Sequence, residues 1–232
     1  NAASDALGVG AAKVDTAYAA MESAISAVDE IKAKLVTASE QSTDKAQIQL
    51  EIGKLQEQLS AIAQGASFSG ENWMVLGDAT QASVVDGFIR TASGGVSVTT
   101  AKFNISSYAM FETIADGVGE GGILGSVMSV QLTSASTQGD IDAFMDIVEF
   151  ALSNLTDSAA AIGALQTRID LQDSYSAKLS DAMESGVSRL VDADMEEESA
   201  KLSALQTQQQ LAIQSLSIAN SSAQNIMSLF QQ

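Results

Sequence analysis

The sequence predicts a mainly α-helical protein with a small β-rich insert, in which both ends of the chain form a long antiparallel, coiled-coil rod domain. Apolar residues recur at spacings of four and three near both ends, which is the seam pattern of packed helices. The middle is rich in Gly, Ser, Thr and Val, a composition that favours short strands and turns. The 232 residues include no Pro, which suits long helices because an internal Pro costs about 3 kcal/mol.

The N-terminal part is predicted to form two helices. The first carries its apolar seam from Val14 to Leu35, and the second carries its seam from Ile48 to Ile62. Gly65 follows the second seam and suits a left-handed C-cap. Two seams joined by a short polar loop predict an antiparallel helical hairpin.

The loop between these helices holds the residues expected to start the second one. Ser42 or Thr43 is expected to cap this helix, because a side-chain hydroxyl accepts a hydrogen bond from a free backbone N–H. Asp44 would then lie in the first turn, where the helix dipole favours an acid.

The segment after the hairpin predicts a β-rich insert that faces outward, at Gly77–Ser136. Ser69–Gly70 is a turn signal just before it, and Gly117–Gly125 is interpreted as a flexible connection. Trp73 is expected to anchor the insert against the helices. Short strands are predicted at Val84–Thr91, Gly95–Ala101 and Lys102–Ser106.

Helix is predicted to resume at about Thr137 and to continue, with a joint near Gly186, to the end of the chain. Acidic residues from Asp192 to Glu198 mark the expected start of the last helix, where the macrodipole favours them. The third seam is expected to pack on the hairpin as a bundle, because no seam can bury itself. The rod seam is formed by Val14, Tyr18, Met21, Ile25, Val28, Ile48, Ile52, Leu55, Leu59, Ile62, Ile162, Leu165 and Ile169.

These elements divide the chain into segments with different roles. The predicted segments are the N-terminal rod helices with the first β turn (1–76), the surface-exposed β-rich insert (77–136), the C-terminal rod helix (137–188) and a C-terminal, terminal-domain helix (189–232).

The last segment is amphipathic, and no remaining part of the sequence is free to cover its apolar side. An isolated helix of this kind is marginal in water, so it needs a partner. The residues expected to form its assembly stripe are Leu202, Leu205, Leu211, Ile213, Leu216, Ile226, Leu229 and Phe230.

The composition argues against an enzyme. Without any Cys or His, the chain lacks thiolate chemistry, the commonest general base and the commonest metal ligand. No catalytic, cofactor-binding or metal-binding residue is therefore assigned. The net charge of −18 would repel nucleic acid and anionic lipid, and no apolar run approaches the roughly 20 residues that span a bilayer.

Two stretches of the sequence carry a resemblance to a known family. These are Ser67-Phe68-Ser69-Gly70-Glu71-Asn72-Trp73 and the ending Gln224-Asn225-Ile226-Met227-Ser228-Leu229-Phe230. With the paired helices before them, they resemble bacterial flagellin over nearly the whole chain, and the first stretch is similar to the α-proteobacterial, rhizobial type. The family also has an N-terminal helix that pairs with the C-terminal tail, and that helix is expected to be missing here.

The resemblance implies a structural subunit of the flagellar filament that gives motility. It implies export unfolded through the flagellar type III channel, folding under a filament cap protein, and a homopolymer outside the cell. Family chaperones grip the C-terminal segment, so a flagellar export chaperone is a further expected partner.

The resemblance also points to a receptor segment at Asp29–Ser39. Some flagellins are recognised there by an animal Toll-like receptor through an Arg-rich stretch. This chain has Glu30, Lys32 and Lys34 instead, with the sign altered at one position. We therefore expect weak receptor activation.

Two other functional classes remain as alternatives. The first is a flagellin homologue that binds polysaccharide at the cell surface, which would need an aromatic-lined cleft in the insert. The chain has one Trp and three Tyr, which weakens this alternative. The second is an enzyme lodged in the insert, which fails for lack of a His-Glu-x-x-His metal motif.

Overall fold

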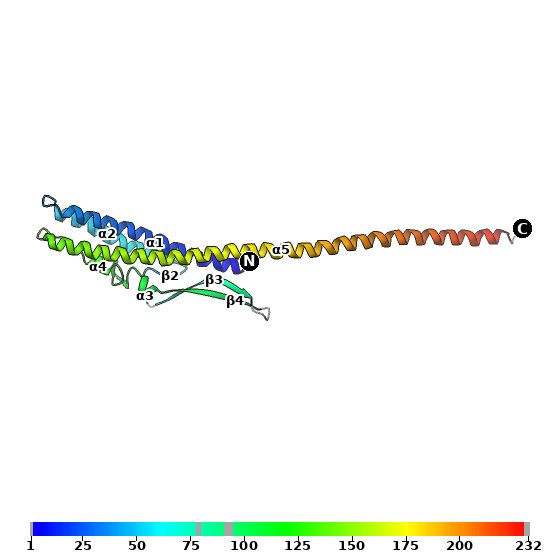
Figure 1. Cartoon of the computed structure of the whole chain (residues 1–232), viewed down its shortest axis with the longest axis horizontal. Helices are drawn as coiled ribbons and strands as arrows, with labels where there is room; N and C mark the ends of the chain where they lie inside the picture. Colours follow the sequence, from blue (N-terminus) through cyan, green and yellow to red (C-terminus); the bar gives the residue numbers. More distant parts are fainter. Residues whose placement is uncertain (1, 78–79, 91–94, 230–232) are drawn as a thin grey trace. The chain divides into compact units, whose positions relative to one another are not determined.

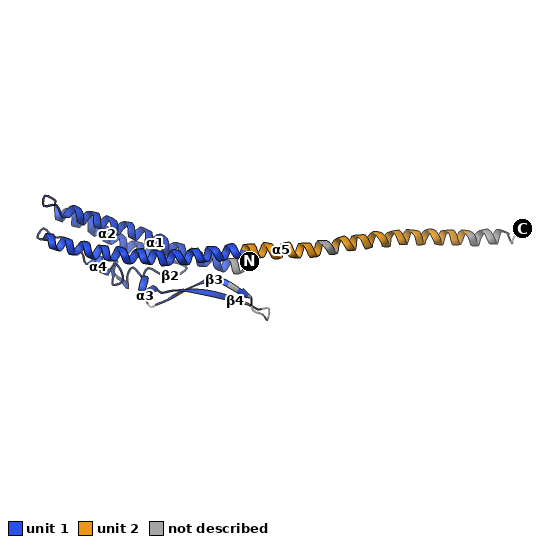
Figure 2. Cartoon of the chain, viewed as in Figure 1, with its two compact units in different colours: residues 1–176 blue, residues 177–232 orange. Residues whose placement is uncertain are grey.

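The computed structural model describes residues 2–77, 80–90 and 95–229. The chain divides into two compact units, unit 1 at residues 1–176 and unit 2 at residues 177–232 (Figure 2). The elements in chain order are α1 (Ala2–Ala38), α2 (Lys45–Gly65), β1 (Ser67–Phe68), β2 (Glu71–Asn72), β3 (Ala82–Arg90), β4 (Val96–Phe103), α3 (Ile105–Tyr108), β5 (Thr113–Ala115), β6 (Val118–Glu120), α4 (Gly125–Met128) and α5 (Gln138–Leu229).

Helices α1 and α2 form the predicted hairpin and lie side by side in unit 1 (Figure 1). An ion pair of 2.7 Å joins Lys34 Nζ to Glu51 Oε2 across the two helices. The cap of α2 differs from the prediction. Asp44 is the N-cap residue, and its Oδ1 accepts hydrogen bonds from the backbone N–H groups of Ala46 and Gln47. A carboxylate satisfies these free donors and also complements the helix dipole, which explains why it replaces the neighbouring hydroxyls.

The first part of α5 runs antiparallel to α1 within unit 1. Lys32 Nζ lies 2.8 Å from Glu149 Oε1, and Gln166 Nε2 donates to Asp15 Oδ1 at 2.6 Å. Residue numbers rise along one helix as they fall along the other, which fixes the antiparallel direction. Unit 1 therefore contains the helical rod that the sequence predicted.

A reciprocal cap starts α5. The backbone N–H of Thr137 donates to Asp140 Oδ2 at 2.7 Å, and the backbone N–H of Asp140 donates to Thr137 Oγ1, which is a capping box. The hydrogen bond from the Thr137 backbone, helped by the Thr137 hydroxyl, lowers the pKa of Asp140 below its usual value of 3.8. The prediction that helix resumes at about Thr137 is confirmed.

This cap makes a testable contribution to acid stability. Because the pKa of Asp140 is lowered by folding, its stabilisation is present above the unfolded pKa and is lost as the pH falls through the folded pKa. We expect the Asp140→Asn variant to lose less unfolding free energy than the wild type as the pH falls below about 4. Urea unfolding at a series of pH values measures this, and parallel pH profiles for the two proteins would contradict it.

Within the described residues, the short strands form three separate antiparallel pairs. The β1–β2 pair turns at Ser69 and Gly70, whose φ angles are 53° and 83°, so the predicted turn is confirmed. The β3–β4 hairpin contains a register shift between Val85 and Gly87. The prediction of a separate strand at Lys102–Ser106 was wrong, because β4 continues to Phe103 and the chain then enters α3.

The prediction that Gly117–Gly125 is a flexible connection was also wrong. Residues Val118–Glu120 form β6, which pairs with β5 across a turn where Asp116 and Gly117 have φ angles of 50° and 82°. Positive φ at both central residues is the geometry of a tight hairpin turn, and Gly supplies it at low cost. Glycine in this segment therefore makes an ordered turn.

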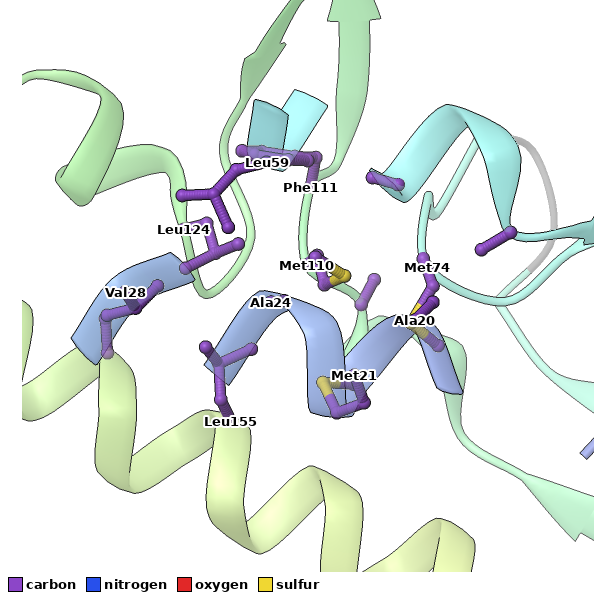
Figure 3. Close-up of a cluster of buried hydrophobic side chains, with 14 of the residues drawn as sticks. Ala20, Met21, Ala24, Val28, Leu59, Met74, Met110, Phe111, Leu124 and Leu155 are labelled. Atoms are coloured by element: carbon purple, nitrogen blue, oxygen red, sulfur yellow. The ribbon is translucent and has the colours of Figure 1, made fainter. Parts of the chain in front are cut away.

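The middle segment contributes to the core of unit 1. Met110, Phe111 and Leu124 are fully buried, in contrast to the expectation that all of Gly77–Ser136 faces outward. Figure 3 shows Phe111 and Leu124 in one cluster with Leu59 of α2 and Leu155 of α5. The rod core is therefore built from the helices together with residues of the insert.

Polar residues of α2 hold this segment in place. The buried amide of Gln56 donates through Nε2 to the carbonyl oxygens of Val127 at 2.9 Å and Val130 at 3.0 Å. The hydroxyl of Ser60 accepts from the backbone N–H of Gly119 at 3.1 Å. These bonds satisfy backbone groups that would otherwise be buried without partners, a loss of about 1–3 kcal/mol each.

Helix α5 continues through Gly186 and through Asp192–Glu198 without the predicted joint or new helix start. A glycine inside a helix costs only about 1 kcal/mol, and many favourable residues surround it. The division of the chain into four segments stays a prediction, namely 1–76, 77–136, 137–188 and 189–232. The two compact units meet after Ser176 and do not test these boundaries.

Candidate assembly surface

The predicted rod seam lies in the interior of unit 1. Fully or almost fully buried are Val14, Met21, Val28, Ile48, Ile52, Leu59, Ile162, Leu165 and Ile169. The remaining predicted seam residues are partly buried and pack against this core, namely Tyr18, Ile25, Leu55 and Ile62. In Figure 3, Leu155 of α5 belongs to the same buried cluster as Met21 and Val28 of α1. Unit 1 thus buries the apolar seam that its helices carry.

Unit 2 presents the opposite situation. Its described residues form the C-terminal part of α5. The apolar residues of the predicted stripe whose side chains are described are 57% to 72% exposed. These exposed residues are Leu202, Leu205, Leu211, Ile213 and Leu216. Ile226 and Leu229 belong to α5, but their side chains are not described, and Phe230 lies outside the described residues. A long row of exposed aliphatic residues is typical of an interaction surface.

The helix geometry separates the predicted stripe into two faces. Successive residues of an α-helix are rotated by about 100°, so Leu202, Leu205, Ile213 and Leu216 of the stripe fall within about 80° of the circumference. We name this the major face, and it consists of Val191, Met195, Leu202, Leu205, Ile213 and Leu216. Leu211 follows Leu202 by nine residues, about 2.5 turns, and therefore lies on the opposite side.

The opposite side carries a second, smaller apolar group. Ile218 follows Leu211 by seven residues, so the two share a face that we name the minor face. Both side chains are exposed. The tail therefore presents apolar residues in two directions, and the single stripe predicted from the sequence was too simple.

Polar residues also enter the major face. Glu198 and Gln209 lie within it by the same geometry. Lys201 Nζ is 3.0 Å from Glu197 Oε1 and 3.9 Å from Glu198 Oε1, so the acidic cluster is partly neutralised by its own helix. All these groups are exposed, and exposed pairs of this kind add little stability.

One ion pair that sequence reasoning missed ties the β3–β4 hairpin to the rod. Asp86 is buried in β3, and its Oδ2 accepts a hydrogen bond from Arg168 Nη2 of α5. Asp86 continues the two-residue alternation of β3 after the buried Ala82 and Val84, which places its carboxylate on the inward face of the strand. No local pattern links residues 82 positions apart, so the sequence carried no signal for this contact.

The predicted receptor segment is part of the rod. Lys32 and Lys34 form the ion pairs with Glu149 and Glu51 described above, and the hydrogen bonds that they donate to these carboxylates raise the pKa of both lysines above 10.5. Glu30 is exposed on the same helix. The two cations of this segment are therefore already engaged by acidic side chains of the same chain.

Other kinds of site are not supported by the described part of the chain. No group of three or more acidic, His or Cys side chains there is arranged to hold a metal ion. Among the described helices, none is long and apolar enough to cross a membrane. A cavity of about 400 Å³ beside β2 and β3 is bordered by Glu71, Gln81 and Trp73. Trp73 is buried and stacks on Phe103 at 5.3 Å, so it does not form the open aromatic cleft that polysaccharide binding would need.

A buried helical rod joined to a helix with exposed apolar faces defines a class of protein: a structural subunit that packs against other chains. Residues 1–75 match the family model of the bacterial flagellin N-terminal helical region, and residues 145–230 match that of the C-terminal helical region. The chain belongs to the bacterial flagellin family.

Relatives agree with this assignment. Flagellin C of Rhizobium meliloti (strain 1021) is 42% identical over 257 residues, which cover 98% of this chain and 80% of the relative. A flagellin of Brucella melitensis biotype 1 (strain 16M) is 41% identical over 234 residues, covering 100% of this chain and 78% of the relative. The crystal structure of Bacillus cereus flagellin superposes with a TM-score of 0.54 at 13% identity, covering 73% of this chain and 86% of that one. This last similarity shows the shared fold.

The protein is thus a structural subunit of the bacterial flagellar filament, which lies outside the cell, and it is not an enzyme. The resemblance to the rhizobial type is confirmed by these relatives. Nothing in the comparisons supports polysaccharide binding.

Proposed function

We propose that the apolar faces of unit 2 are the surfaces through which this subunit assembles into the filament. The observation that carries the proposal is the contrast in burial. The rod seam is enclosed by unit 1, whereas Leu202, Leu205 and Leu216 are more than half exposed. Exposed apolar area favours association by about 25 cal/mol per Å² that becomes buried.

The charge of the chain makes the apolar faces more important for assembly. Copies that each carry a net charge of −18 repel one another. Attraction between subunits must therefore come from surfaces that lack charge, and the major face provides such a surface apart from Glu198. Head-to-tail contacts that do not close on themselves generate a helical polymer. A helix that is marginal alone and ordered by packing couples its folding to assembly.

Removal of the tail tests this proposal. We expect a chain lacking Arg189–Gln232 to form no filaments, because it lacks both apolar faces, while unit 1 retains its cooperative unfolding. Electron microscopy under polymerising conditions measures the first property, and thermal unfolding followed by circular dichroism measures the second. Normal filaments from the truncated chain would refute the proposal.

The same surface suits two further partners. A flagellar export chaperone that covers the major face of the tail would prevent premature polymerisation during export through the type III channel. A filament cap protein would then hold the arriving subunit while the tail packs. Both roles follow from family membership and from the exposed faces, since each partner must shield apolar residues such as Leu205 and Ile213.

Receptor recognition by this flagellin is expected to be weak. Lys32 and Lys34 are engaged by Glu149 and Glu51, and Glu30 adds a negative charge where receptor-active relatives are positive. A cell-reporter assay for the Toll-like flagellin receptor measures this. Strong stimulation at nanomolar dose would contradict the expectation, and the Glu30→Arg variant serves as a control that restores the positive sign.

A further inference from the structure

The methionines of this chain differ sharply in exposure. Met21, Met74 and Met110 are fully buried in unit 1, whereas Met195 is 65% exposed in unit 2. Met195 also lies on the major face, four residues after Val191 and seven residues before Leu202. A dissolved oxidant therefore reaches an assembly residue in the free subunit, while the thioethers of the rod core are shielded.

We propose that Met195 is a redox-modification site at which a peroxide blocks assembly of the filament. The thioether sulfur attacks one oxygen of hydrogen peroxide and the O–O bond breaks. The sulfur gains that oxygen and becomes a sulfoxide, and the peroxide is reduced to water. The sulfur loses two electrons, the peroxide gains them, and no bond of the protein chain is broken.

The product is unsuited to the position that Met195 occupies. A sulfoxide is polar and accepts hydrogen bonds, whereas Val191 and Leu202, the apolar residues before and after Met195 on the major face, are aliphatic. Packing that face would bury the new oxygen without a donor, which is unfavourable. This consequence rests on the proposed role of the major face in assembly.

The position of Met195 also implies that its reactivity depends on the state of the subunit. In the free subunit the sulfur is accessible, and in a polymer that buries the major face it is covered. Met183 is less exposed, at 39%. It comes twelve residues before Met195, which places it about 120° away around the helix axis. It is therefore off the major face and provides a matched control.

The modification itself is tested by treating the full-length subunit with hydrogen peroxide and mapping its peptides by mass spectrometry. We expect Met195 to be converted at least about tenfold faster than Met21, Met74 and Met110, because those residues react only after local opening of the core. Equal rates at Met195 and the core methionines would overturn the proposal. So would equally fast oxidation of Met195 in preformed filaments.

The consequence is tested by sedimenting polymer from peroxide-treated wild type, Met195→Leu and Met183→Leu. We expect Met195→Leu to polymerise as it does without peroxide, and the other two proteins to lose most of their polymer. Equal losses in all three, or no loss in the wild type, would overturn the proposal. Failure of the untreated wild type to polymerise would instead contradict the proposed function. It would also refute the effect of Met195 oxidation on assembly. The selective oxidation of Met195 would then be judged from the mass-spectrometric result.

Discussion

The Leu205→Asp substitution is expected to abolish polymerisation of the full-length protein. Leu205 is 62% exposed in the subunit and lies on the major face, so its replacement changes little before assembly. Packing that face would then bury a carboxylate beside Leu202, one turn away on the same face. Burial of an unpaired charge is costly, and a loss of about 3 kcal/mol per contact raises the critical concentration about 100-fold. Sedimentation of polymer over a concentration series measures this.

The control for this variant is Ser203→Asp. Ser203 lies two residues before Leu205, a rotation of about 200° around the helix axis, so its side chain is on nearly the opposite side of the helix. It is also exposed, and the substitution adds the same charge to the same turn of α5. We expect it to polymerise at a concentration close to that of the wild type. Equal loss of polymer in both variants would indicate a general charge effect and would contradict the role of the major face.

The Phe111→Ala substitution is expected to cause the largest loss of rod stability. Phe111 is fully buried and lies against Gly119, where an added Cβ would come within 2.4 Å of the ring. Gly119 has no side chain that could move into the space left by the ring, so a cavity should remain. Removing a buried Phe side chain costs about 3–5 kcal/mol. Urea unfolding at neutral pH measures the change in unfolding free energy.

Phe150→Ala is the matched control, since it removes the same side chain from a position on α5 that is 69% exposed. We expect its unfolding free energy to lie within about 0.5 kcal/mol of the wild type. Equal destabilisation by the two variants would show that the middle segment is not part of the rod core.

Much of the helical rod could be predicted from the sequence because its signal is local. Residues such as Val14, Met21 and Val28 recur at seven-residue spacing, and that pattern needs no knowledge of distant partners. The turn at Ser69–Gly70 was also predictable, since Gly adopts positive φ easily. Helix ends were less certain, and Asp44 took the cap that a neighbouring hydroxyl was expected to provide.

The middle segment was harder to predict because its structure depends on contacts far away in the sequence. The burial of Phe111 and Leu124 requires the rod helices, and the order of Gly119 requires the hydroxyl of Ser60. The glycine-rich composition suggested flexibility, whereas Gly119 and Gly122 allow close approach to Phe111 and Met110 of the same segment. The Asp86–Arg168 pair escaped prediction for the same reason.

The tail illustrates a limit of periodicity over long distances. Leu202 and Leu211 are both apolar and both exposed, so a stripe drawn along the sequence includes them together. The accumulated rotation of the helix places them on opposite sides. A tail with apolar residues in two directions suits packing against more than one neighbouring chain.

The central claim is that the rod folds alone and that assembly stabilises the tail. Hydrogen–deuterium exchange of residues 187–221 tests this claim most directly when it is compared between free subunits and filaments. In free subunits we expect rapid exchange of these amides and slow exchange in α1 and α2, because only the latter are enclosed by a core. In filaments we expect the tail amides to become as protected as those of the rod. Equal protection of the tail in the two states would contradict the account.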